Sequence, residues 1–219
     1  MEDNKMDQLK NLPESSLRFK NKEMTKRKLI EAVSAIIRTE GYTGLGVNKI
    51  AKQAGVHKKL IYRYFETVER LIEAYVIEKD YWLLTSNQLY NRPVNSNVDL
   101  KELALGILED QFNFFYQEKE MQQLILWEIS GKSQLMKSIS ATRELLGDDF
   151  LQLTDDYFKD SDINFRALSA ILSAGIYYLV LHAPVSSYCG ISIQQTRDRE
   201  EMVRTIRQVI SMAFEKVKG

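Results

Sequence analysis

The sequence has 219 residues and 44% hydrophobic residues, enough for one large or two modest domains with a buried core. One cysteine, Cys189, excludes an intramolecular disulfide and suits a reducing cytoplasm. Three prolines and ten glycines leave little material for a strand-and-turn fold, and the runs of Leu, Ile, Glu, Lys, Gln and Ala favour an all-α fold.

The formal net charge of zero conceals an uneven distribution of charge along the chain. Residues 1–70 contain 15 Lys and Arg against 9 Asp and Glu, whereas residues 71–219 contain 15 against 21. Within residues 18–65 the counts are 12 against 3. A basic first part attached to an acidic body predicts contact with a polyanion. A solvated lysine-rich surface is the alternative.

The first twenty residues are polar and contain no apolar run of the kind found in a signal peptide, so we expect a flexible arm over 1–20. A helix is predicted to follow, with Thr25 as its N-cap and Gly41 as its stop. Two short helices are predicted over 47–53 and 57–65.

The two short helices are joined by a tight turn and predict a helix-turn-helix. Gly55 takes a positive φ at no steric cost, and the small Ala51 allows the helices to cross closely. Ile61 and Phe65 are four residues apart and face inward. The opposite surface carries Lys58, Lys59 and Tyr62.

Three motifs occur in order between residues 25 and 71: an apolar helix ending in "EGY", the turn "IAKQAGV" and the ending "LIYRYF". This arrangement resembles the DNA-binding module of the TetR family of bacterial regulators. The resemblance implies a helix-turn-helix domain over 21–67 and a helical effector-binding and dimerisation domain over 68–219. It also implies a sequence-specific transcriptional regulator, a homodimeric repressor released from its operator by a small, largely apolar effector.

By the same resemblance, Lys58, Lys59 and Tyr62 would contact bases in the major groove, with Tyr64 and Asn48 on phosphates. Lys26 and Lys28 would add backbone contacts. His57 stands where the family often has a serine or threonine cap, and we expect it against a phosphate instead. Val68 stands where the family often has lysine, which removes one phosphate contact. Packing tyrosines and solvated lysines are the alternatives.

Later helices are predicted over 67–90, 98–117, 119–131, 133–158, 164–183 and 196–217, with a loop at "NRPVNSN". Residues 167–196 contain no charged side chain, but their apolar part, 167–181, is shorter than the ~20 residues that span a membrane. We therefore expect a buried or interface helix there, and no membrane contact.

The last two helices predict a dimer interface built with two-fold symmetry from small and apolar residues at helical spacing. The expected interface residues are Ala170, Ala174, Met202, Ile206, Val209, Ile210, Ala213 and Phe214. The alternative is that this apolar stripe belongs to the core of one chain.

The middle helices carry large aromatic residues, which we expect to line an apolar effector pocket. The expected ligand-binding residues are Phe112, Phe115, Tyr116, Trp127, Tyr157 and Tyr178. The alternative is an ordinary aromatic core.

Enzyme classes fit the sequence poorly. Its two histidines, His57 and His182, lie far apart, and neither belongs to a carboxylate-x-x-His pair of a di-metal bundle. Zinc spacing and a glycine-rich phosphate loop are also missing, so we expect no catalysis, no metal and no cofactor. The expected partners are a double-stranded DNA operator, a second copy of the chain and a small effector. The alternative function is a helical dimeric ligand-binding or adaptor protein that does not bind DNA.

Overall fold

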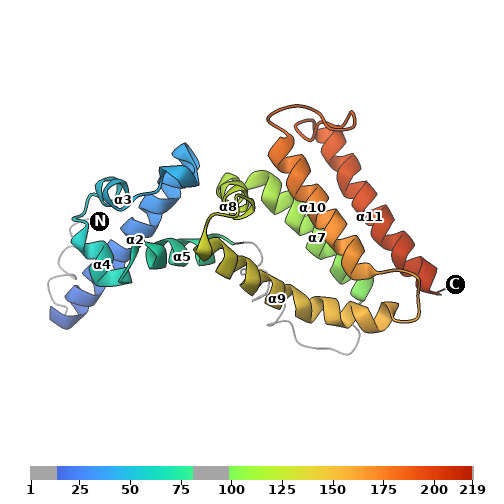
Figure 1. Ribbon diagram of the computed structural model, residues 1–219, viewed down its shortest axis with the longest axis horizontal. Coiled ribbons are helices and arrows are strands. Elements are labelled where there is room, and N and C mark those ends of the chain that lie inside the picture. Colours follow the sequence, from blue (N-terminus) through green and yellow to red (C-terminus); the bar gives the residue numbers. More distant parts are fainter. Residues whose placement is uncertain (1–13, 81–98, 219) are drawn as a thin grey trace, which may run out of the picture. The chain divides into compact units, whose positions relative to one another are not determined.

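The computed structural model describes residues 14–80 and 99–218 (Figure 1). The predicted all-α fold is confirmed, because every regular element in these residues is a helix. The chain divides into two compact units, Met1–Val76 and Ile77–Gly219.

The first unit contains α2 (Glu14–Glu40), the 3₁₀ helix η1 (Tyr42–Gly44), α3 (Val47–Gln53), α4 (Lys59–Phe65) and most of α5 (Val68–Lys79). Helix α2 packs against η1, α3 and α4. The buried apolar side chains of this unit include Leu29, Val33, Ile36, Ile37, Ile50, Ala51, Ile61 and Leu71. The spacing of the apolar residues on α2 therefore produces the core on which the two short helices rest.

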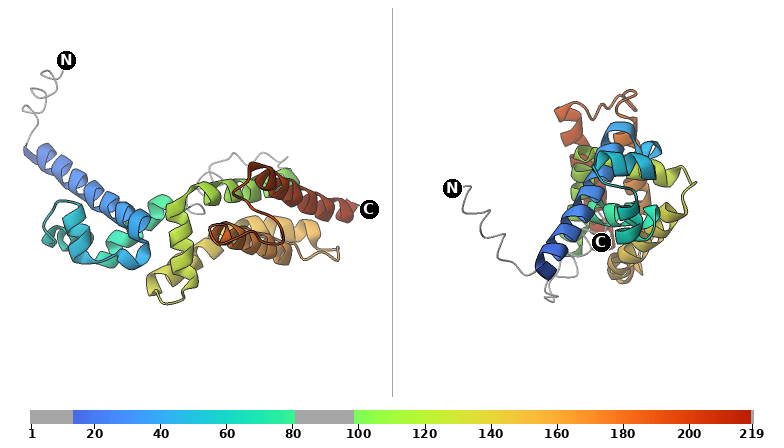
Figure 2. Two further views of the ribbon diagram at one scale, coloured as in Figure 1. Left: turned by 90° about the horizontal axis from the view of Figure 1, so that it is seen from above. Right: turned by 90° about the vertical axis from the view of Figure 1, so that its left-hand side faces the viewer.

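Helix α2 begins well before the predicted N-cap, and the left view of Figure 2 shows it as one uninterrupted helix. Thr25 lies inside it, where its hydroxyl donates a hydrogen bond to the carbonyl of Asn21 at 2.8 Å. Residues 14–20, predicted as part of a flexible arm, are its first turns. This stretch lacks glycine and proline, so nothing in it stops a helix. Residues 1–13 of the predicted arm lie outside the described residues.

The second unit contains α7 (Leu100–Gln117), α8 (Lys119–Ile129), α9 (Gln134–Phe158), α10 (Phe165–His182) and α11 (Thr196–Lys218). These bounds agree with the predicted ranges to within two residues. Three of the starts have side-chain caps: Asp99 accepts from the N–H of Lys101 at 2.9 Å, and Ser133 and Asn164 cap α9 and α10. The predicted helix over 67–90 begins as α5, and its part beyond Asp80 lies outside the described residues.

Helix α7 packs along α11 and α10, and α10 also contacts α9 and α8 (Figure 1). An aromatic cluster joins α9, α10 and α11 at one end of this unit. Phe158 stacks on Phe165 with ring centroids 4.7 Å apart, and Phe214 meets Phe158 edge-on at 4.9 Å. Such ring pairs add to the stabilisation from burial alone, so this cluster fixes the ends of three helices.

Helix α10 is the most apolar helix of the second unit, and it is long and apolar enough to cross a membrane by length and composition alone. Only 17% of its residues are buried inside the chain. Ala170, Ile171, Ala174 and Tyr178 are exposed on it. One chain therefore leaves an apolar face of α10 uncovered, which agrees with the interface helix expected from the sequence better than with a buried one.

Candidate nucleic-acid interface and effector cavity

The turn between α3 and α4 is held by backbone geometry. Gly55 has φ 65°, a conformation that residues with a side chain rarely adopt. The N–H of Val56 then donates to the carbonyl of Ala51 at 3.0 Å, which closes the end of α3. Ala51 and Ile61 are buried beneath the turn. The chain therefore leaves α3 and enters α4 in the tight form that the sequence predicts.

His57 lies just before α4 and takes part in its cap. Its ring Nδ1 accepts a hydrogen bond from the backbone N–H of Lys59 at 3.2 Å. The imidazole therefore supplies a hydrogen-bond acceptor of the kind that a serine or threonine cap provides, from a larger side chain. The His57 residue is exposed.

The exposed face of α4 carries free positive charge. Lys58, Lys59 and Tyr62 are all exposed, and the Tyr62 side chain is 50% accessible. Arg63 is exposed beside them, and its guanidinium lies 5.8 Å from the ring centroid of Tyr64. Within the described residues, none of these three cations has a carboxylate partner.

Sequence reasoning missed Arg63 as a site residue. Arg63 follows Lys59 by four positions, which places both side chains on one face of the helix. This spacing is the sequence feature that could have identified Arg63.

The other expected DNA contacts differ in how available they are. Asn48, in the first turn of α3, and Lys28 on α2 are exposed. Tyr64 is half-buried, and the guanidinium of Arg63 lies over its ring. Lys26 is already paired with Glu23 at 3.5 Å. The structure therefore gathers Lys58, Lys59, Tyr62 and Arg63 on α4 and leaves Lys26 partly neutralised.

A second candidate site, the inner cavity, has a volume of about 390 Å³ between α7, α8, α9 and α10 and is partly open to solvent, where Glu144 and Ala170 of its lining are exposed. Its apolar lining includes Ile107, Leu108, Phe150, Leu151 and Phe165. Its polar lining includes Glu128, Ser140, Arg143, Glu144, Arg166, Ser169 and Ser173. An apolar wall with a few polar groups is typical of small-molecule sites.

Both arginines of the inner cavity are already engaged by carboxylates. Arg143 donates from Nε to Asp80 at 2.6 Å and pairs with Glu128. Burial alone would lower the pKa of Arg143, but the charges of Asp80 and Glu128 outweigh it and raise the pKa. Arg166 pairs with Asp155 and Asp148, each at 2.6 Å.

The Arg166 cluster changes the ionisation of its members. Hydrogen bonds from Arg166 lower the pKa of Asp155 and of Asp148, and Asp148 also accepts from Gln152. The same bonds raise the pKa of Arg166 itself. All three groups are therefore charged at neutral pH.

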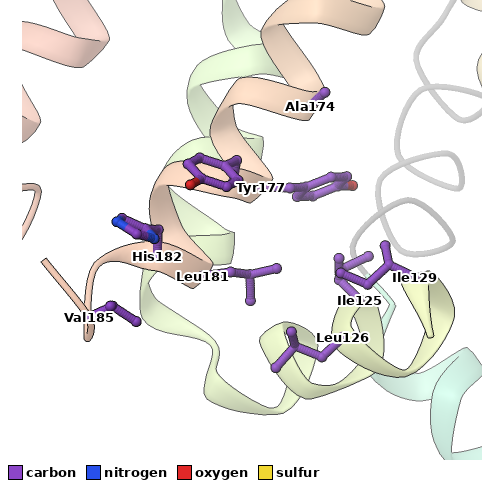
Figure 3. A pocket seen from close by; sticks show the side chains of 9 residues that line it. Ile125, Leu126, Ile129, Ala174, Tyr177, Leu181, His182 and Val185 are labelled. Atoms are coloured by element: carbon purple, nitrogen blue, oxygen red, sulfur yellow. The ribbon is translucent and has the colours of Figure 1, made fainter. Parts of the chain in front are cut away.

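An open apolar groove of about 430 Å³ lies between α8 and the C-terminal half of α10. Figure 3 shows Ile125, Leu126 and Ile129 of α8 on one side and Leu181 and Tyr177 of α10 on the other. Tyr177 lines both this groove and the inner cavity. The two spaces therefore share one wall.

The six aromatic residues expected to bind a ligand do not gather at one place. Phe112 and Phe115 are buried in the core, and Tyr116 lies under the guanidinium of Arg199. Tyr157 belongs to the aromatic cluster with Phe214. Trp127 is half-buried on α8, and Tyr178 lines the open groove. The lining of the inner cavity contains none of the six.

The expected dimer residues separate into two sets. Ile206, Ile210, Ala213 and Phe214 are buried within one chain, where α11 packs on α7. They belong to the core, the alternative that the sequence left open, because a side chain already buried has no surface left for a partner. Ala170 and Ala174 are exposed on α10, and Met202 and Val209 are half-buried on α11.

Within residues 14–80 and 99–218, the structure brings no three His, Cys, Asp or Glu side chains together in a way that could hold a metal ion.

A family model described as bacterial regulatory proteins, tetR family, matches residues 29–75. These residues run from α2 through α3 and α4 into α5 and contain the whole helix-turn-helix. The resemblance noted in the sequence is therefore confirmed over this module. A comparison with curated proteins gives no match.

Solved structures of bacterial proteins share the fold of the chain. FadR from Bacillus subtilis, solved with stearoyl-CoA, matches with TM-score 0.58 at 17% identity, covering 84% of this chain and 96% of FadR. GusR from Salmonella enterica gives 0.61 at 14%, covering 87% and 95%. NalD from Pseudomonas aeruginosa, described as the secondary repressor of the MexAB-OprM multidrug efflux pump, gives 0.60 at 17%, covering 88% and 96%. At these sequence identities the likeness to these structures shows a shared fold alone.

Proposed function

We propose that this chain, a member of the TetR family of bacterial regulators, is a homodimeric transcriptional repressor that leaves its operator when a small molecule occupies the inner cavity. The observation that carries the DNA-binding part is the exposed face of α4. It presents Lys58, Lys59 and Arg63 without carboxylate partners in the described residues, beside the exposed Tyr62. Such a face binds a polyanion without first breaking ion pairs.

The roles follow from position on the helix-turn-helix. Lys58, Lys59 and Tyr62 read the major groove from the first turns of α4. Arg63, Asn48 and Tyr64 contact the phosphate backbone, with Arg63 pre-positioned by the Tyr64 ring. His57 contacts a phosphate through the ring nitrogen that does not accept the hydrogen bond from the N–H of Lys59.

The exposed face of α10 supports dimerisation. Ala170 and Ala174 allow a partner helix to approach closely, and Ile171, which is 70% accessible, supplies apolar area for it to bury. A two-fold dimer presents two α4 helices, and half-sites on DNA one turn apart are about 34 Å from centre to centre. Dimerisation thereby turns one short recognition helix into a reader of a palindromic site.

The inner cavity supports regulation by a small molecule. NalD is a repressor and FadR was solved with an acyl-CoA, so both roles have precedents in this fold. Asp80, the residue directly after α5, is held by Arg143 of the cavity lining. A ligand that moves Arg143 therefore acts on the end of the helix that continues from the DNA-binding module. A ligand shifts DNA binding only if it favours the DNA-free conformation.

The test is fluorescence anisotropy of the full chain with DNA from upstream of its own gene, at two salt concentrations. We expect binding as a dimer that weakens steeply with salt, because Lys and Arg release counterions from phosphates. Lys59→Ala and Tyr62→Phe should weaken it. The absence of binding to this fragment and to a selected pool of random DNA would overturn the proposal and favour the adaptor alternative.

A further inference from the structure

The charged residues in the lining of the inner cavity are two arginines and two carboxylates. Two guanidinium groups, Arg143 and Arg166, lie in its lining, and each is engaged by two carboxylates. Neither arginine therefore presents an unpaired positive charge to the cavity. The lining also contains Glu144, which has no partner in the described residues. Among the described residues, Glu144 is the charged residue of this lining for which no ion pair is seen.

To pair with an arginine of this lining, an anionic ligand would have to displace the carboxylates that already bind it. Asp80 has 0% of its surface accessible, and Arg143 is its hydrogen-bonded cation. Withdrawing Arg143 would leave a fully buried carboxylate without this compensation, which is strongly unfavourable. Arg166 is more accessible, but it donates to Asp155 through two nitrogens and to Asp148 through a third bond. Neither arginine is thus free for an anion.

A cationic ligand meets no such cost. The Glu144 carboxylate is exposed at the cavity and unpaired in the described residues, so a cation placed there breaks no ion pair. The Glu128 carboxylate, also in the lining, uses Oε2 for Arg143. The body of the ligand would lie against Phe150, Phe165 and Tyr177, whose rings attract cations through their faces.

We propose that the inner cavity binds a lipophilic cation, with its charge beside Glu144 and Glu128 and its apolar body against the aromatic wall. This inference rests on the proposed function, because it names the chemical class of the effector of the same site. It excludes fatty acids, acyl phosphates and other amphipathic anions as tight ligands.

The test compares two probes of nearly the same shape and opposite charge, tetraphenylphosphonium and tetraphenylborate, by isothermal titration calorimetry on the full chain. We expect the cation to bind at least about tenfold more tightly than the anion. Glu144→Gln should weaken the cation about three- to tenfold, because it removes one attractive charge without changing the size of the side chain. Asp156→Asn, an exposed carboxylate on the same helix outside the cavity lining, should leave it unchanged.

Ser169→Leu locates the site, since it fills the inner cavity and should abolish binding of the cation. Val185→Ser, in the open groove, should not. Equal or tighter binding of tetraphenylborate, no binding of either probe, or an unaffected Glu144→Gln would overturn the inference. Operator binding by the unmodified chain is measured in parallel. If the inference fails but the unmodified chain binds operator DNA, only the assignment of the ligand class is wrong. If the unmodified chain does not bind operator DNA, the proposed function itself is wrong.

Discussion

Arg143 on α9 donates a hydrogen bond to Asp80 over 2.6 Å, although 63 positions separate the two residues in the chain. Both are buried, with 8% and 0% of their side chains accessible. The pair joins the end of α5 to the helix that lines the inner cavity. Removing one member leaves the other charge buried, so its effect on stability should exceed that of any surface pair.

Asp80→Asn should therefore lower the free energy of unfolding by about 3–5 kcal/mol, measured by urea denaturation of the full chain. The matched control is Arg70→Ala, which removes the exposed pair between Arg70 and Glu73 and should cost less than about 1 kcal/mol. Similar shifts in the two variants would show that the buried pair contributes no more than a surface one.

The cluster around Arg166 should make stability depend on pH at the acid end. Its hydrogen bonds hold the pKa values of Asp148 and Asp155 below the ordinary value of 3.8, so both carboxylates are stabilised in the folded state. This contribution is fully present above the unfolded-state pKa and is lost as the pH falls through the lower folded-state values. The melting temperatures of the native chain and of Arg166→Gln should differ at pH 6 and converge below about pH 4. A constant difference down to pH 2.5 would contradict this.

Two glycine substitutions should have opposite signs. Gly55 has φ 65°, so Gly55→Ala should destabilise the chain by about 1–2 kcal/mol although the space around it is open. Gly106 lies inside α7 with open space around it and no positive φ, so Gly106→Ala should stabilise by up to about 1 kcal/mol. Thermal unfolding of both variants checks the signs, and a stabilising Gly55→Ala would exclude a strained turn.

Arg63, which is not among the residues expected from the sequence, should contribute to DNA affinity by contacting a backbone phosphate. Arg63→Gln should weaken binding about equally for all sequences and reduce the slope of log K against log salt by about one. Lys26→Ala should change the slope less, because Lys26 is already paired with Glu23. Anisotropy titrations at four salt concentrations measure both slopes, and the reverse order would place the DNA backbone on α2 instead.

The proposed dimer should be sensitive to charge on α10 but not to charge on α9. Ile171 and Leu145 are exposed to similar extents, 70% and 74%. Ile171→Glu should convert the dimer to a monomer in sedimentation velocity, because it buries a charge in an apolar interface. Leu145→Glu should not. If both variants remain dimeric, the partner binds elsewhere.

Most of the fold could be predicted from the sequence because the apolar spacing and the capping residues act locally. Asp99, Ser133 and Asn164 cap α7, α9 and α10, and these helices begin within two residues of their predicted starts. The start of α2 could not be predicted in the same way. Its first turns carry no apolar stripe, and Thr25 resembles a cap although it lies mid-helix.

The candidate sites were predictable to different degrees. The exposed face of α4 follows from spacing within one short helix. The inner cavity depends on four helices that the sequence does not place, so its charged lining, Arg143 and Glu144 above all, could not be inferred. For the same reason the spacing on α11 could not show that Ile206 and Ile210 meet α7 in the same chain and not a partner.

Tyr177 forms part of two walls, one facing the inner cavity and one facing the open groove beside the uncovered face of α10. In the proposed assembly, a bound molecule that turns this ring also reshapes the surface on which the second copy docks. Association between subunits and binding of the small molecule are then linked equilibria, and each alters the other by the same factor. The apparent dissociation constant of the effector should consequently change with the concentration of the protein itself.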